Sequence, residues 1–291
     1  MTDLLSTFEQ EKKFKKVIEN AAEKALRRAI FDNQGLQRIL ERSNELEKDI
    51  IKSVKKHSLS DRFAHEEITW GRKNYPECYK VKSIDVQVNI LRQIVTLLGC
   101  PNGTFVGNSF PPGAEGWFVI LKWQLLGETY HKAVEKILKI LEEEHVGLFE
   151  NQCPGRLGEK YLRQHEQTKN KLQLLAEKQK WEHEMLLVPA QFGLVHRGKS
   201  VRRAREVFLE NEFGLGIFEV ACMLLTHPER LVSFDNLWID CPGDEYAPGG
   251  GNFFPHAPYF CLYDGQLRLN TVSISSTSSS SGPVSGFLPR P

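Results

Sequence analysis

The sequence has little net charge, and it lacks the features of an exported or membrane-spanning chain. Its 38 Lys and Arg residues balance 37 Asp and Glu residues, so the net charge is only +1. No whole-molecule field therefore attracts nucleic acid or an anionic membrane. The amino terminus has no basic segment followed by an apolar run, and no uncharged apolar run is long enough to span a bilayer. We therefore predict a soluble, cytoplasmic protein that makes no membrane contact.

The six cysteines show no pattern of metal binding or disulfide pairing. They are scattered over 291 residues, and no two of them have the two-residue spacing of a zinc knuckle. In a reducing compartment such cysteines remain free thiols. We therefore predict no structural zinc and no disulfide framework. No cofactor is expected, apart from a divalent cation considered below.

Hydropathy patterns predict an α+β fold, beginning with helices. The apolar fraction of 41% and the charged fraction of 26% are ordinary for a globular protein. Residues 1–57 carry apolar positions at helical spacing and are broken at 32–35, which predicts a helical hairpin or one broken helix. Residues 58–150 form a mixed α/β region. Its patterns predict helices over 84–98 and 130–144 and a buried strand over 117–126.

The second half of the chain is predicted to contain a connecting helix and then a C-terminal α+β unit. Residues 151–187 start with a Pro-Gly break and continue as a long polar helix over 156–187. Residues 188–291 are predicted to place two helices, over 201–211 and 216–226, on a small antiparallel sheet. Asp264-Gly265 between two apolar runs is its best hairpin signal. The Ser-rich tail around 278–281 is low in complexity and is expected to be loosely ordered.

A series of short motifs runs through this last region. In order, they are Val188–Leu194, His196–Gly198, Ser200–Val207, Asn211–Gly216, Leu224–Arg230, Trp238–Tyr246, Ala257–Phe260 and Phe287–Pro289. The ordered set resembles an uncharacterised family of hypothetical proteins from uncultivated, small-genome bacteria. The resemblance implies a bacterial protein. It implies no activity, so no functional residue is transferred from the family.

The segment 196–205 is the most basic part of the chain and the first candidate site. Guanidinium groups at the start of a helix suit phosphate oxygens. The helix that follows is too apolar to read bases, so we predict contact with the backbone of RNA or DNA. Alternatively, the segment pairs with acids of residues 235–267, is a solvated face, or meets an acidic protein partner. The candidate residues are Arg197, Lys199, Arg202, Arg203 and Arg205.

An acidic loop is the second candidate site. Asp240, Asp244 and Glu245 leave a short predicted strand and enter a stretch rich in Pro and Gly. Carboxylates clustered at a strand end can hold a hard cation such as Mg²⁺ or Ca²⁺, which could activate water or clamp a phosphate. The alternative is a soluble turn in which Asp accepts hydrogen bonds from nearby N–H groups.

Three functional hypotheses follow from these two segments and the N-terminal helices. The first is a non-enzymatic binding protein that contacts nucleic-acid phosphate through the basic helix. The second is a metal-dependent enzyme acting on a phosphate ester, with the acidic loop holding the ion and the arginines clamping the substrate. The third is a protein-interaction scaffold built on the helices of residues 1–57. The sequence leaves the oligomeric state open.

Overall fold

The protein divides into two compact units, residues 1–59 and 60–291. The computed structural model describes residues 8–28, 33–58, 60–70, 73–95, 110–145, 148–179 and 184–289. None of the helices in these ranges is long and apolar enough to cross a membrane. The boundaries predicted near 150 and 188 fall inside the second unit.

The first unit consists of three helices: α1 (Phe8–Arg28), α2 (Asn33–Glu41) and α3 (Ser43–Ser58). The helical prediction for residues 1–57 is therefore confirmed, with three described helices in place of a hairpin. Large apolar side chains on these helices remain exposed, including Phe14 at 48% and Leu40 at 62%. Among its described residues, the unit has no buried hydrophobic side chain. Its helices consequently lack the tertiary packing from which most helical stability derives.

The second unit contains an antiparallel sheet whose strands come from distant parts of the chain. Its order is β1 (Gly116–Leu121), β4 (Met185–Gln191), β11 (Ser285–Phe287) and β5 (Glu212–Gly214). β1 and β4 pair along their whole length, from Gly116 opposite Ala190 to Leu121 opposite Met185. The buried strand predicted over 117–126 is thus confirmed in its first half. A 3₁₀ turn, η1 (Trp123–Leu125), replaces its second half.

A second, larger sheet is built around a long hairpin. The strands β8 (His256–Tyr263) and β9 (Gln266–Ser273) pair through the turn at Asp264 and Gly265, as predicted. Both turn residues have positive φ, 50° and 75°, which a two-residue hairpin turn of this kind requires. This sheet is mixed, because two of its pairings are parallel. The other strands are β2 (Phe149–Asn151), β3 (Leu162–Gln164), β6 (Trp238–Asp240), β7 (Asp244–Tyr246) and β10 (Ser281–Pro283).

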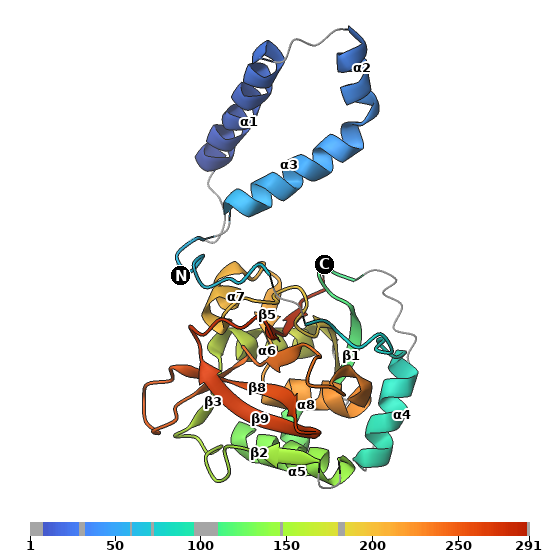
Figure 1. Cartoon of the computed structure of the whole chain (residues 1–291), viewed down its shortest axis with the longest axis vertical. Helices are drawn as coiled ribbons and strands as arrows, with labels where there is room; N and C mark the ends of the chain where they lie inside the picture. The colour runs from blue at the N-terminus through green and yellow to red at the C-terminus, as the bar shows by residue number, and fades with distance from the viewer. Residues whose placement is uncertain are drawn as a thin grey trace. The chain divides into compact units, whose positions relative to one another are not determined.

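One buried helix of the second unit packs against a strand and two other helices (Figure 1). α8 (Ile217–Thr226) is buried over its whole length and packs against β1, α4 and α5. Its position places the start of the helix inside the protein rather than at the surface. The remaining helices are α4 (Ile84–Ile94), α5 (Tyr130–Glu144), α6 (Glu166–Gln179), α7 (Val201–Val207) and the 3₁₀ turn η2 (Pro228–Arg230). The helices predicted near 84, 130, 201 and 216 are all found there.

The predicted long connecting helix over 156–187 is wrong. Among the described residues of this region, 156–179 and 184–187, only α6 is helical, with β3 before it and β4 after it. Leu172 and Leu175 of α6 are buried, so the helix belongs to the core and does not bridge two domains. The apolar run that begins at Met185 becomes a strand because β1 and β11 are available on either side of it, a long-range pairing that the local pattern does not reveal.

The expectation of a loosely ordered Ser-rich tail is also wrong. β10 pairs with β6, and β11 lies between β4 and β5. Ser281 and Ser285 are buried, and the Oγ atoms of both donate hydrogen bonds to buried carboxylates. Small residues here let the chain pass through the interior, where a composition rule based on solvated segments does not apply.

Candidate functional site

The basic helix α7 is held by acids within its own unit. The guanidinium of Arg202 pairs with Glu66, with Nε lying 3.3 Å from Oε2. Arg203 pairs with Glu67 and also with Glu206, at 2.8 Å. Glu66 and Glu67 lie in the segment before α4, outside the 235–267 region that the sequence suggested as the partner. Within that region, Glu245 pairs with Arg205 at 3.8 Å. The guanidinium groups of Arg202 and Arg203 thus fasten residues 60–67 to α7.

The other basic residues also face inward. Arg205 donates from Nε and Nη2 to the backbone oxygens of Pro242 and Asp244, both at 2.9 Å. Arg197 donates to the backbone oxygen of Lys73 at 3.1 Å. Lys199 is half-buried, and this burial lowers the pKa of its ammonium group. The structure therefore does not gather the five candidate cations on one exposed, unpaired face.

The three acids of the loop likewise point to different partners. Asp240 accepts a hydrogen bond of 2.8 Å from the hydroxyl of Ser281. Asp244 contacts the start of α8, and Glu245 pairs with Arg163 at 2.7 Å. Among the residues that the structure describes, no three His, Cys, Asp or Glu side chains form a group suited to a metal ion. A divalent cation at this loop remains a prediction from the sequence.

The acidic segment instead packs against the start of α8, where two glycine-containing segments cross closely. Residues 214–216, which lead into α8, pass directly over residues 242–244. A Cβ atom on Gly214 would lie 2.7 Å from the backbone carbon of Pro242, and one on Gly216 would lie 2.6 Å from the carboxylate of Asp244. Only glycine fits at these positions. The crossing brings the Asp244 side chain against the first turn of α8.

Asp244 is a wholly buried carboxyl group bridging α8 and α5. Its Oδ2 accepts a 2.6 Å hydrogen bond from the N–H of Ile217, and its Oδ1 lies 2.8 Å from the hydroxyl of Tyr130. Burial and the charge of Glu219 raise its pKa to about 8, against an ordinary value of 3.8. Near neutral pH this carboxyl group therefore keeps its proton for most of the time.

Glu219 is a second buried carboxyl group in the same first turn. Its Oε2 accepts a 2.8 Å hydrogen bond from the N–H of Gly216, and the amide of Gln164 approaches Oε1 at 3.4 Å. The side chain is 1% exposed, and burial raises its pKa to about 7. A carboxyl group with this pKa can both donate and accept a proton at neutral pH.

Both Glu219 and Tyr130 line a cavity of about 570 Å³ between β1, α5, β3 and α6. Glu219 is the single polar residue among the buried members of the lining; the others are aliphatic. The exposed members form a rim, which we define as Gln124, Glu159, Arg163, Lys169 and Gln173. A large cavity that contains a group with a shifted pKa is the usual form of a small-molecule site. We call it the Glu219 cavity.

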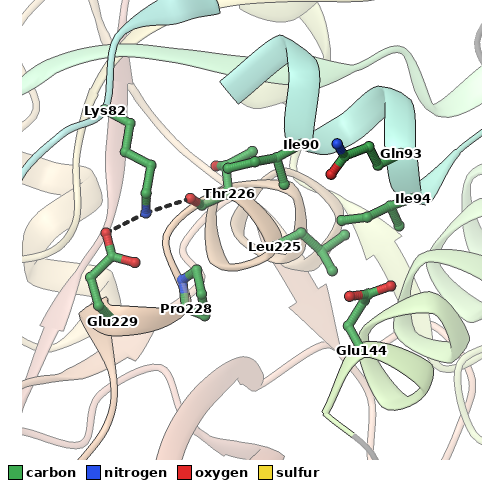
Figure 2. A pocket seen from close by; sticks show the side chains of 9 residues that line it. All are labelled: Lys82, Ile90, Gln93, Ile94, Glu144, Leu225, Thr226, Pro228 and Glu229. Carbon is green, nitrogen blue, oxygen red and sulfur yellow. Dashed lines mark hydrogen bonds and ion pairs between the residues drawn. The ribbon is translucent and has the colours of Figure 1, made fainter. Parts of the chain in front are cut away.

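A second hollow lies at the opposite end of α8 (Figure 2). It has a volume of about 420 Å³ and lies beside α4 and the end of α5. Figure 2 shows the ammonium of Lys82 between Thr226 and Glu229, with Glu144 on the far side of Leu225. Its charged members are an ion pair and the exposed Glu144. None of the lining residues is a fully buried titratable group, which makes this hollow the weaker candidate.

A buried His, Glu and Ser also meet near β5, but in the wrong order for a catalytic triad. Glu212 lies in the middle: its Oε1 is 2.6 Å from Nε2 of His196 and 2.5 Å from the Ser285 hydroxyl. A nucleophilic serine must instead contact the imidazole, which removes its proton. This cluster therefore links β5, β11 and the segment before α7, and it does not form a nucleophile.

Sequence reasoning singled out no residue that lines the Glu219 cavity; it found only Asp244, which contacts the lining residue Tyr130, and for a different role. Glu219 itself had a signal, because it is the single charged residue in an otherwise apolar helix. A charged side chain at such a position is buried and requires a partner or a purpose. Tyr130 and Gln164 had no local signal, since each is an ordinary residue at the start of a helix or in a short strand.

Comparison with known proteins adds no assignment. No family model, curated protein or solved structure matches this chain. The resemblance of residues 188–289 to an uncharacterised bacterial family stays a prediction, and the function is argued from the geometry of the site.

Proposed function

We propose that residues 60–291 bind a small organic acid in the Glu219 cavity. The observation that carries this proposal is the position of Glu219. It is a buried carboxyl group with a pKa of about 7, set into an aliphatic floor beneath a cavity of about 570 Å³. Burying such a group is costly unless it is hydrogen-bonded. Oε2 already accepts the N–H of Gly216, whereas Oε1 has only the 3.4 Å contact with Gln164, so a ligand in the cavity can donate a hydrogen bond to Oε1.

The lining indicates the kind of ligand. The floor includes Leu162, Leu172 and Leu186, which suit an aliphatic or aromatic body. The exposed rim carries two cations, Arg163 and Lys169, and the acid Glu159. Arg163 already pairs with Glu245, so an anionic ligand would meet chiefly Lys169. A cation at the mouth and a titrating carboxyl at the floor suit a molecule that is anionic at one end and carries a neutral hydrogen-bonding group at the other.

Binding can be measured with three ligands of one shape and different charge. Benzoate, benzyl alcohol and benzylammonium are titrated separately against the full chain, with saturation-transfer NMR as the readout. We expect benzoate to bind most tightly and benzylammonium least. Equal binding of all three would show that the rim charges do not act on the ligand. Absence of binding by every one of them would refute the proposal.

Matched variants of α6 locate the binding. Ala176→Trp fills the cavity and should abolish benzoate binding, whereas Leu174→Trp, on an exposed position of the same helix, should leave it intact. Lys169→Glu should weaken benzoate by about fivefold, the effect of losing one exposed charge contact. Lys178→Glu makes the same charge change away from the cavity and serves as its control.

The basic helix gives less support to a nucleic-acid function. Contact with phosphate through Arg202 or Arg203 would require breaking their pairs with Glu66 and Glu67, which leaves these acids without their guanidinium partners. Nucleic-acid binding stays a prediction, for which a direct test is described below.

A further inference from the structure

The Tyr130–Asp244 pair can present a proton to the Glu219 cavity. Asp244 accepts the N–H of Ile217 on Oδ2, and the Tyr130 hydroxyl donates to its Oδ1, a direction that can reverse when the carboxyl group carries a proton on Oδ1. When Asp244 is protonated, it can donate to the tyrosine oxygen across the 2.8 Å contact. The phenol proton is then free to point into the cavity that Tyr130 lines. A buried, neutral carboxylic acid thus strengthens Tyr130 as a hydrogen-bond donor.

Glu219 supplies the complementary group in the same cavity. Glu219 accepts the N–H of Gly216 and Asp244 accepts the N–H of the next residue, Ile217, so both carboxyl groups lie at the start of α8, and Asp244 joins Tyr130 to them. The contacts of Glu219 with Gly216 and Gln164 orient its carboxyl group without neutralising it. Near neutral pH a large fraction of the Glu219 side chains is ionised and able to accept a proton.

We propose that the Glu219 cavity catalyses enolisation of a small organic acid that also carries a ketone or aldehyde group. Glu219 removes a proton from the carbon beside the carbonyl group. The electron pair of that C–H bond forms the C=C bond of the enolate, and the carbonyl π pair moves onto oxygen. The Tyr130 hydroxyl donates a hydrogen bond to this oxygen. When Glu219 exchanges this proton with solvent and then returns a solvent proton to the same carbon, the result is hydrogen exchange; delivery to a neighbouring carbon gives isomerisation, and neither needs an oxidant, reductant or second substrate.

The inference rests on the proposed function, since the acid must first bind. It assigns Glu219 and Tyr130 as catalytic residues, because both would touch the reacting atoms. Asp244 is a positioning residue that acts through Tyr130. Its ionisation would give the phenol proton an acceptor within the protein and withdraw it from the substrate. Activity should therefore rise with pH as Glu219 ionises near 7, and fall as Asp244 ionises near 8.

The experiment uses 4-acetylbenzoate, which adds an enolisable methyl ketone to the benzoate frame. The full chain is incubated with this probe in D₂O, and ¹H NMR follows the loss of the acetyl methyl signal, while saturation transfer measures binding in the same sample. We expect exchange above the buffer rate. Glu219→Gln should lower it by roughly 10²- to 10⁴-fold and Tyr130→Phe by roughly 10²-fold, each with binding retained.

Asp244→Asn separates positioning from a purely structural role. The Asn amide can still donate to the tyrosine oxygen but does not titrate. The fall in exchange above pH 8 should therefore disappear in this variant, whereas a merely structural role would lower the rate at every pH alike.

The outcomes distinguish the two proposals. If benzoate itself does not bind, the proposed function fails. If 4-acetylbenzoate binds without exchange, or if Glu219→Gln exchanges as fast as the wild type, only the enolisation proposal is overturned. It is also overturned if benzoate binds and 4-acetylbenzoate does not, because the cavity then has no room for a carbonyl group beside Tyr130.

Discussion

The stability of the protein should depend on pH through Asp244, and an Asp244→Asn substitution should remove this dependence. The pKa of Asp244 is raised from 3.8 to about 8 in the folded protein. Between these two values the folded state holds a proton that the unfolded chain has released. The stabilisation of the folded state by this proton is therefore fully present below pH 4. It is lost as the pH rises to 8, by about 1.4 kcal/mol per pH unit. Asn accepts the Ile217 N–H and does not titrate.

The expected change is large enough to measure by urea unfolding at pH 5, 6, 7 and 8. From pH 5 to pH 8, the free energy of unfolding of Asp244→Asn should rise by about 4 kcal/mol relative to that of the wild type. Asp264→Asn is the control. It makes the same chemical change at a side chain that is 76% exposed. Asp264 has a positive φ, which Asn also tolerates. Its curve should run parallel to that of the wild type. If the free energy of unfolding of Asp244→Asn changes with pH as that of the wild type does, Asp244 is not a buried, protonated carboxyl group in the folded protein.

Three further outcomes are expected. Gly214→Ala forces a Cβ atom against Pro242 and Gly243 and should cost about 1–3 kcal/mol in urea unfolding, whereas Gly158→Ala, with open space around it, should be close to neutral. Deleting residues 1–59 should leave the melting temperature of the remaining unit unchanged, and a fall of several degrees would show that the helices stabilise it. Labelled RNA and DNA should bind weakly even at low salt in fluorescence anisotropy, because the α7 arginines are paired; tight, steeply salt-dependent binding that is lost in Arg202→Ala would restore the nucleic-acid hypothesis.

Local patterns predicted several elements well. The helical spacing within 130–144 corresponds to α5 residue for residue, and the Asp264-Gly265 turn appears where two apolar runs flank it. In both cases the signal lies within a few residues: a repeating apolar stripe, or a pair of residues that tolerate positive φ. Ser200 likewise caps α7, where its side chain accepts the N–H of Arg203.

The predictions failed where distant segments decide the structure. The chain around 156–187 has weak helical periodicity, and its two strand segments form against partners from elsewhere: β3 against residues 244–246 and the start of β4 against residues 116–121. The Ser-rich tail looked solvated because its residues are small and polar. In the fold Ser281 lies on β10 beside β6, Ser285 lies on β11 between β4 and β5, and both are buried.

The candidate site shows the same division. The sequence alone determined that Asp244 lies in an acidic stretch rich in Pro and Gly, and that Glu219 is the lone charge in an apolar segment. Only the tertiary structure decided that both carboxyl groups lie at the start of α8, with Asp244 against Tyr130 and Glu219 lining the cavity. Their separation along the chain, from residue 130 to residue 244, hides the contact from any local pattern. Their shifted pKa values are likewise a product of burial, which exists only once the segments around α8 have packed together.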